Sequence, residues 1–353
     1  MNNPESLFYS TRLRLANGLH LWIRPRPGSG TVALKMIIPV GSRHETEANN
    51  GISHFLEHML FTGTARWPEH EVTDVIRRRG GEVNAVTEVE STTFWLHLPA
   101  SDVALGVDWL AEVLFRPTLD RAKFEKERGV IMAEKGGRFG GFEELYEWVE
   151  DQGWGWSVYR AISHRLFPDS ALNLPTIGRD SSLLRISHDD LLAFYGTHYW
   201  PNNMTLVVVG DVQAAEVEEA ARRAFGDFPA GPLPPRPATP PPHNGDFHLR
   251  LHGPSINEQG QVLLGAPTPG LAHPDRWPLN ALAEVLNASL TRSIRYERGL
   301  AYGVSVGPSL YTDCGYFEIY TTADSQHFAE IVGEVQRELE RALSGDIGED
   351  EVA

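Results

Sequence analysis

Two histidines and a glutamate stand within five residues of one another, in the segment His54-Phe55-Leu56-Glu57-His58. If this segment is helical, His54 and His58 lie on one face and can present both imidazoles to a single cation, while Glu57 borders that face. Imidazole is a frequent zinc ligand, and a carboxylate next to a metal site can act as a general base. The spacing therefore predicts a metal-binding helix. The alternative is an amphipathic core helix whose histidines only form hydrogen bonds.

A catalytic zinc usually takes three protein ligands and a water, so two histidines are too few. The chain has a single cysteine, Cys314, and a further ligand must therefore be an imidazole or a carboxylate. One candidate is Glu134, which follows Glu127 by about two helical turns and would share its face. Acidic residues are frequent in this chain, and spacing alone does not select Glu134 over a solvated surface acid.

Alternating and helical patterns indicate which elements would position these residues. The expected elements are a hairpin around Asn17-Gly18, a strand at 32–40, helices at 52–61 and 68–79, one or two strands at 82–98, helices at 103–114, 121–134 and 186–195, and a strand at 204–209. The basic run Arg77-Arg78-Arg79 precedes Gly80-Gly81 and is typical of a helix C-terminus. Strands mixed with long helices predict an α+β fold.

A proline-rich segment divides the chain. Eight of the 24 prolines lie between Pro229 and Pro242, a density that favours a stiff extended connector. We expect a first half at 1–228, a linker at 229–245 and a second half at 246–353. The second half is expected to contain strands at 248–252 and 261–264, a helix at 277–294, strands at 301–306 and 315–321, and a helix at 327–343. The order resembles the start of the first half, which suggests two copies of one fold.

Composition narrows the class of protein. Against 47 acidic residues stand 31 Lys and Arg, giving a net charge of −16, and a nucleic-acid partner is not expected because no basic stripe neutralises phosphates. Residues 1–11 lack the apolar stretch of a secretory signal, and no segment approaches the roughly 18 apolar residues of a membrane span. A cytoplasmic location without a membrane span is therefore predicted.

Several motifs, taken together, resemble the pitrilysin or insulinase family of zinc metallopeptidases, whose motif has the order H-x-x-E-H, and within it the short processing-peptidase-like members. The matching segments are Asn50–Thr64, Gly80–Ala85, the pair Glu127 and Glu134, Ile177-Gly178, Tyr199–Met204, Val207–Asp211 and Arg292–Tyr302. The resemblance implies two homologous α+β halves, each a mixed β-sheet flanked by helices, that close like a clamshell over a peptide. Only the first half is expected to bind metal, because the second helix, at 280–286, carries no histidine pair.

The resemblance also implies the roles of the site residues. In the family the third ligand is a Glu about 76 residues beyond the second His, and Glu134 stands at that distance from His58. One Zn²⁺ per chain would be bound by His54, His58 and Glu134, with Glu57 as the general base. Glu127 matches the family's second acidic residue and would support the ligands from behind.

Substrate contacts follow from the same resemblance. Residues 82–87 resemble the family's edge strand, so the backbone around Asn84 and Ala85 would pair with an extended peptide. From the second half, Arg295 and Tyr302 match a pair that orients the substrate carbonyl and stabilises the oxyanion. Without the resemblance, an Arg and a Tyr at this spacing are equally well explained by packing and an ion pair.

The predicted function is therefore a zinc-dependent endopeptidase acting on peptides or unfolded polypeptides. Two alternatives stay open: a catalytically silent subunit of a heteromeric peptidase or structural assembly, and a metal-binding subunit that needs a partner's Arg/Tyr half. A homodimer or a heterodimer with a second family member is among the assemblies implied. The family's second half continues past the point matching 345–351, so we expect the second half to be truncated.

Overall fold

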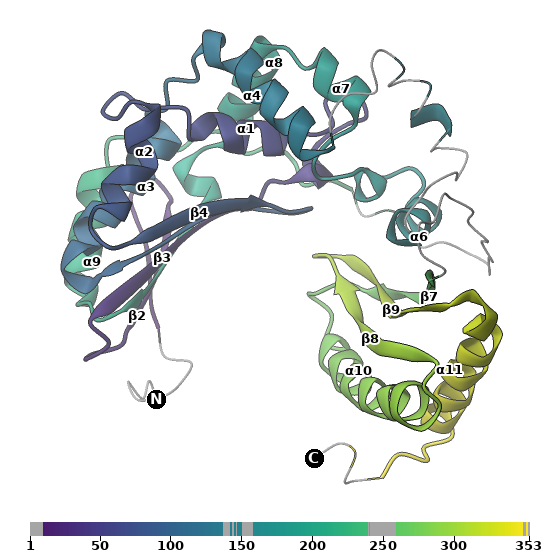
Figure 1. Ribbon diagram of the computed structural model, residues 1–353. Coiled ribbons are helices and arrows are strands. Elements are labelled where there is room, and N and C mark those ends of the chain that lie inside the picture. The colour runs from purple at the N-terminus through teal and green to yellow at the C-terminus, as the bar shows by residue number, and fades with distance from the viewer. Residues whose placement is uncertain are drawn as a thin grey trace. The chain divides into compact units, whose positions relative to one another are not determined.

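A computed structural model describes residues 10–136, 142, 145, 147–149, 158–238, 240, 259–348 and 351. The chain divides into two compact units (Figure 1). The first unit comprises 1–147 and 174–237, and the second comprises 148–173 and 238–353. Segment 148–173, expected in the first half from the sequence, is thus grouped with the second unit.

A six-stranded sheet forms the centre of the first unit, in the order β1-β2-β6-β3-β5-β4. Its strands are β1 (Thr11–Arg14), β2 (His20–Pro25), β3 (Thr31–Ile38), β4 (Glu82–Thr87), β5 (Thr92–Pro99) and β6 (Thr205–Gly210). The pair β2 and β6 is parallel and the other pairs are antiparallel, so the sheet is mixed. In β3 every second residue is buried, as the alternating sequence predicts. Strand β4 lies at the edge of the sheet.

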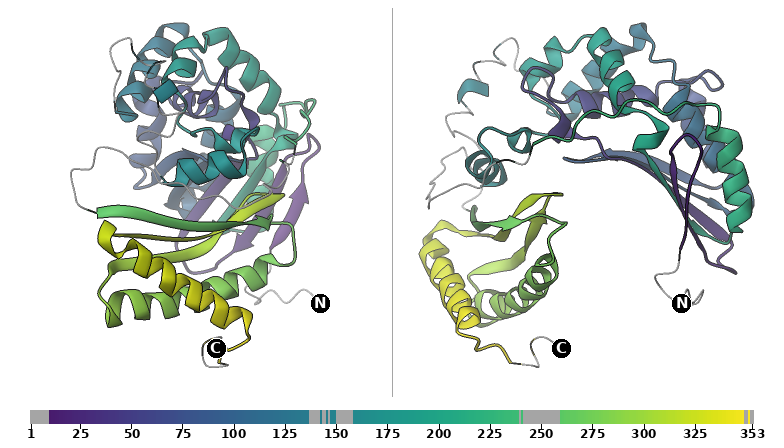
Figure 2. Two further views of the ribbon diagram at one scale, coloured as in Figure 1. Left: turned by 90° about the vertical axis from the view of Figure 1, so that its right-hand side faces the viewer. Right: turned by 180° about the vertical axis from the view of Figure 1, so that it is seen from behind.

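Helices pack around this sheet and complete the core of the first unit. They are α1 (Ile52–Leu60), α2 (Glu69–Arg77), α3 (Val103–Phe115), α4 (Arg121–Glu134), α7 (Asp180–Arg185), α8 (His188–His198) and α9 (Ala214–Phe225). Helices α3 and α9 lie side by side on the sheet, whereas α1 contacts β4, α4 and α8 (Figures 1 and 2). The rings of Phe55 in α1 and Phe124 in α4 stack with their centroids 4.5 Å apart, which fixes these two helices against each other.

The second unit has a smaller sheet, β7-β9-β8, which is antiparallel over the described residues. Its elements are α6 (Val158–Leu166), β7 (Gln259–Pro269), α10 (Arg276–Leu290), a π-helical segment η5 (Thr291–Glu297), β8 (Ala301–Leu310), β9 (Cys314–Asp324) and α11 (Phe328–Leu343). Helices α10 and α11 pack together, and their apolar faces bury Leu286 and Ile331 with Ile319 of β9. The alternate residue Tyr320 contacts Tyr159 of α6 instead.

The α+β class and its two helix-flanked sheets are confirmed. The expected strand at 248–252 lies outside the described residues, and residues 229–238 of the proline-rich linker form neither helix nor strand. Helix α9 was not expected from the sequence. Within the described part of the chain, no helix has the length and apolar character needed to cross a membrane.

Candidate metal centre

Helix α1 presents the residues of the H-x-x-E-H motif. Its apolar side chains, among them Phe55 and Leu56, are fully buried in the core, and this fixes the rotation of the helix. The imidazoles of His54 and His58 are only partly buried, and their ring centroids lie 4.7 Å apart. The sequence therefore brings both histidines to one face, as the four-residue spacing predicts.

The N-terminus of α1 is capped by a carboxylate from outside the helix. Glu45 is buried and accepts hydrogen bonds from the backbone N–H groups of Gly51 and Ser53 and from the side chain of Asn50, at 2.7–2.9 Å. Burial raises the pKa of Glu45, and these hydrogen bonds partly oppose the rise. A negative charge at this end also complements the helix dipole, so Glu45 fixes where α1 begins.

Close backbone packing holds the same end of α1. Gly51 has a φ of 93°, and a Cβ atom there would lie 2.7 Å from the Cα atom of Gly178. The side chain of Asn50 spans this contact by accepting from the N–H of Arg179 and donating to the carbonyl of Pro175. Only glycine fits at position 51, which explains the Asn-Gly pair that precedes the motif.

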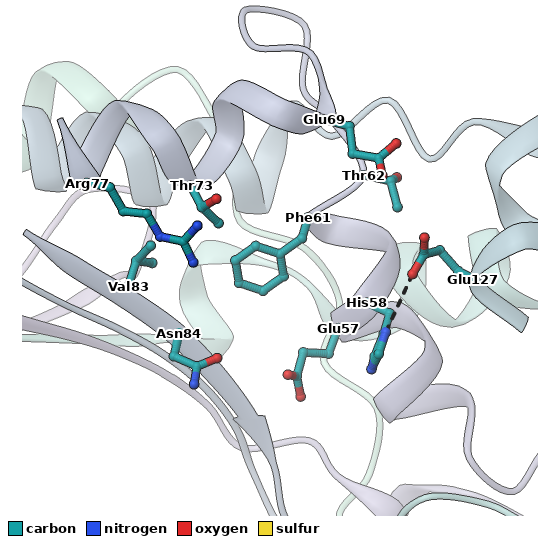
Figure 3. A pocket seen from close by; sticks show the side chains of 10 residues that line it. All are labelled: Glu57, His58, Phe61, Thr62, Glu69, Thr73, Arg77, Val83, Asn84 and Glu127. Carbon is teal, nitrogen blue, oxygen red and sulfur yellow. Dashed lines mark ion pairs between the residues drawn. The ribbon is translucent and has the colours of Figure 1, made fainter. Parts of the chain in front are cut away.

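Helix α4 brings two carboxylates to the histidines. Glu134 Oε2 lies 3.4 Å from His58 Nε2 and 3.9 Å from His54 Nε2. Glu127 lies about two helical turns before Glu134 in α4. It is buried, and its Oε2 lies 3.5 Å from His58 Nδ1. The structure thus brings His54, His58 and Glu134 together, with Glu127 behind His58 (Figure 3 shows the pair of His58 and Glu127).

The donor set fits a zinc ion. One ligand atom from each of His54, His58 and Glu134 lies within 4.8 Å of the others, and this is the only such group of three among the described residues. Ligands at about 2.0–2.2 Å from a tetrahedral ion lie roughly 3.3–3.6 Å from one another. The distances from Glu134 Oε2 to His58 Nε2 and His54 Nε2, 3.4 and 3.9 Å, are near this range. The side chain of Glu134 is 51% exposed, so solvent or a substrate can reach this side of the site.

Glu57 stands beside these ligands on the same helix. Its carboxylate accepts a hydrogen bond of 2.5 Å from the hydroxyl of Thr87, at the end of β4. Burial raises the pKa of Glu57, whereas the hydrogen bond from Thr87 and the charge of His58 lower it. Burial also lowers the pKa of His54, which favours the neutral imidazole that a metal requires.

A pocket of about 320 Å³ opens next to the histidines, between α1, α2 and β4. It is lined by Glu57, His58, Phe61, Thr62, Glu69, Thr73, Arg77, Val83, Asn84 and Glu127 (Figure 3). Asn84 is exposed and Ala85 is half-buried, both on the edge strand β4. The free side of this strand therefore borders the pocket that holds Glu57 and His58.

Arg295 and Tyr302 belong to the second unit. Tyr302 in β8 is 82% exposed, and the guanidinium carbon of Arg295, in segment η5, lies 4.6 Å from the centroid of its ring. The two side chains are therefore close enough for a cation–π contact.

Sequence reasoning missed three residues near the site: Glu45, Thr87 and Arg77. Glu45 and Thr87 reach α1 from other segments, and no spacing within a helix or strand indicates such contacts. Arg77 was assigned to a helix C-terminus, which it does occupy, but it also lines the pocket. A signal for it existed in the length of α2, because a helix of known start and end fixes which residues share a face.

Two family models match the chain. The model described as insulinase (peptidase family M16) covers residues 23–136, and the model described as peptidase M16 inactive domain covers residues 185–353. The first match includes His54, Glu57, His58 and Glu134, and the second includes Arg295 and Tyr302.

Named relatives give the same result. An uncharacterised zinc protease of Mycobacterium leprae is 30% identical over 95% of this chain and 74% of its own length. The mitochondrial-processing peptidase subunit beta of Blastocladiella emersonii is 28% identical over 89% of this chain and 66% of its own length. Among solved structures, a protease from Helicobacter pylori superposes with a TM-score of 0.84 at 22% identity, covering 97% of this chain and 82% of that one. At this identity the likeness establishes the fold alone.

Proposed function

This chain belongs to the insulinase (M16) family of peptidases, and from that premise we propose that it is a zinc-dependent endopeptidase acting on peptides or unfolded polypeptides. The observation that supports this most is the meeting of His54, His58 and Glu134 beside the buried carboxylate of Glu57. One Zn²⁺ per chain would be held by the first three residues.

Zinc bound there supplies a water of lowered pKa and polarises the carbonyl of the bond to be cleaved. Glu57 accepts the proton of the attacking water on its carboxylate and later gives it to the leaving amine. The hydroxyl of Thr87 holds one oxygen of Glu57 by its hydrogen bond, so the carboxylate keeps one orientation during both transfers. The carboxylate of Glu127, whose Oε2 lies 3.5 Å from His58 Nδ1, would favour the tautomer that offers Nε2 to the metal.

The edge of β4 would hold the substrate. Its backbone at Asn84 and Ala85 is at the open side of the sheet, where an extended peptide can add as a further strand. Main-chain pairing of this kind tolerates many sequences and requires an extended chain, which fits peptides and unfolded polypeptides better than folded domains.

The second unit would complete the reaction. The exposed hydroxyl of Tyr302 and the guanidinium of Arg295 are suited to stabilise the charge that develops on the carbonyl oxygen and to orient the carbonyl. A cytoplasmic location stays part of the proposal.

One alternative has an observation in its favour. A relative of this chain is named as a subunit of a processing peptidase, and the second family model is described as inactive. We therefore propose, as the second candidate, a subunit that is active only in a homodimer or in a heterodimer with a second family member.

The test combines metal analysis with cleavage. We expect the purified chain to bind one zinc and to cleave a quenched peptide library, with loss of activity on chelation and recovery on adding zinc. Glu57→Gln should keep its zinc and lose about 10²–10⁴-fold in kcat. Undiminished cleavage by the zinc-loaded Glu57→Gln variant would contradict the mechanism. Zinc binding without cleavage, until a second family member is added, would favour the subunit.

A further inference from the structure

The pocket beside the metal centre has a graded lining. Phe61, the residue that follows α1, lies between Glu57 and the side chain of Arg77, and Val83 of β4 lies beside Arg77 at the far end of the pocket (Figure 3). The guanidinium of Arg77 points toward the space between Phe61 and Asn84 in this view. A side chain entering from the metal centre would therefore pass the ring of Phe61 first and meet the cation of Arg77 last.

Arg77 is the last residue of α2, and Arg78 and Arg79 follow it; the three side chains differ in what they contact. Arg78 forms an ion pair of 3.7 Å with Asp74, and Arg79 forms one of 3.7 Å with Asp102. For the side chain of Arg77, no ion pair or hydrogen bond occurs within the part of the chain that the structure describes. Arg77 is also the only one of the three that lines the pocket.

The acidic residues of the pocket are already engaged by other groups. Glu69 pairs with Lys123 and Lys126, at 3.3 and 2.6 Å. Glu127 pairs with His58, and Glu57 accepts from Thr87. None of these carboxylates therefore balances the positive charge of Arg77. Arg77 also carries the only guanidinium or ammonium group among the ten lining residues.

We propose that this pocket receives a substrate side chain adjacent to the cleaved bond, and that Arg77 makes it selective for an acidic side chain of glutamate length. The inference rests on the proposed function and adds the substrate class. A peptide paired with β4 directs alternate side chains to the same face of the sheet, so one of them can enter the pocket. The methylene groups of a glutamate would lie against Phe61 and Val83, and its carboxylate would form a two-point contact with the guanidinium.

This local preference differs from what the net charge of −16 alone would favour. The overall acidity attracts basic peptides over long distances, and that attraction is screened by salt. A direct contact with Arg77 acts at one substrate position and is screened less. The two effects are separable, because raising the salt concentration should weaken the first more than the second.

The test compares peptides that differ at one position, with Glu, Gln or Lys in turn at each of the two residues on either side of the cleaved bond. We expect the zinc-loaded enzyme to favour Glu over Lys by about tenfold or more in kcat/KM at one of these positions. Arg77→Gln should remove the preference, and Arg77→Glu should reverse it. The matched controls Arg78→Gln and Arg79→Gln, at the same helix end, should leave it unchanged.

Binding gives an independent readout. Affinities of fluorescein-labelled Glu and Lys peptides for zinc-loaded Glu57→Gln, with and without Arg77→Glu, report the preference without cleavage. If binding shows the preference and its reversal while no variant cleaves, the proposed function fails and the selectivity stands. The selectivity is overturned if the ratio of Glu to Lys peptides is the same in the parent, Arg77→Gln and Arg77→Glu, or if the Arg78 and Arg79 variants change it equally.

Discussion

The two units of the molecule differ in what their long helices carry. In the first unit, α1 presents His54, Glu57 and His58, and α4 supplies the facing carboxylates. In the second, α10 follows a strand in the same order but has no histidine and only one acidic residue, Glu284, and no group of three metal-competent side chains occurs among the described residues there. The second unit instead carries the half-buried Arg295 at the end of this helix and the exposed Tyr302 on the next strand. Under the proposed function, two similar frameworks would divide the work, with metal binding in the first unit and charge stabilisation in the second.

The ends of the two helices show how each unit is adapted. Neither α1 nor α10 has a capping side chain at its own N-cap residue, but α1 receives the buried carboxylate of Glu45. At its other end, α10 continues into the π-helical segment η5, which carries Arg295. Such segments are costly and are frequent at functional sites. The two helices therefore differ at opposite ends: α1 is capped at its start by Glu45, whereas α10 is extended at its end by the π-helical segment η5.

The largest effect should come from separating the contributions of the two units. Tyr302→Phe removes the hydroxyl of the second unit, and we expect a loss of about 10²–10³-fold in kcat, because one donor to the developing oxyanion disappears. Zinc content should stay at that of the parent, since the ligands lie in the first unit. Rates from single-turnover cleavage, with metal analysis of the same samples, check both statements.

A conservative control is available on the same unit. Tyr296→Phe removes the hydroxyl of another exposed tyrosine, whose ring centroid lies 5.1 Å from the guanidinium carbon of Arg295, and should leave kcat unchanged. Equal losses in both variants, or a loss of zinc in Tyr302→Phe, would break the division of roles between the units.

Part of the candidate site could be predicted from the sequence, and the part that could not depends on tertiary contacts. The shared face of His54 and His58 and the strand character of 82–98 follow from local periodicity, because helix and strand spacing decide which side chains share a face. The position of 82–87 at the edge of a sheet was implied only by the family resemblance. The facing Glu134 could be assigned only through the family resemblance, since contact between α1 and α4 depends on tertiary packing such as that of Phe55 on Phe124. Glu45 escaped prediction for the same reason: its hydrogen bonds to α1 follow from the path of a loop, and loops carry no periodic signal.

A smaller effect is expected at the support behind His58. Glu127→Gln replaces the carboxylate that faces His58 Nδ1, and we expect zinc affinity to fall by about 10–100-fold, because the tautomer and the basicity of the ligand are no longer fixed. Competition with a chromogenic chelator measures the change. Glu125→Gln, an exposed acid on the same helix that pairs with Arg128, is the matched control and should keep the parent's affinity. If Glu127→Gln binds zinc as tightly as the parent, the buried carboxylate of Glu127 contributes only to packing.

The smallest effect concerns the helix start that distinguishes α1 from α10. Glu45→Gln keeps the size of the side chain, but its NH₂ group would face N–H groups that now donate hydrogen bonds to the carboxylate oxygens. We expect a loss of about 1–3 kcal/mol in the free energy of unfolding, measured by urea titration with the zinc removed. Burial raises the pKa of Glu45, which shows that burying its negative charge is unfavourable. The neutral Gln avoids this desolvation cost, so we expect the loss of stability to lie at the lower end of the roughly 1–3 kcal/mol range. The exposed neighbour Glu47→Gln should change stability by less than about 0.5 kcal/mol. If the two variants are equally stable, the capping of α1 by Glu45 contributes nothing to the fold, and the contrast between the two helix starts loses its energetic basis.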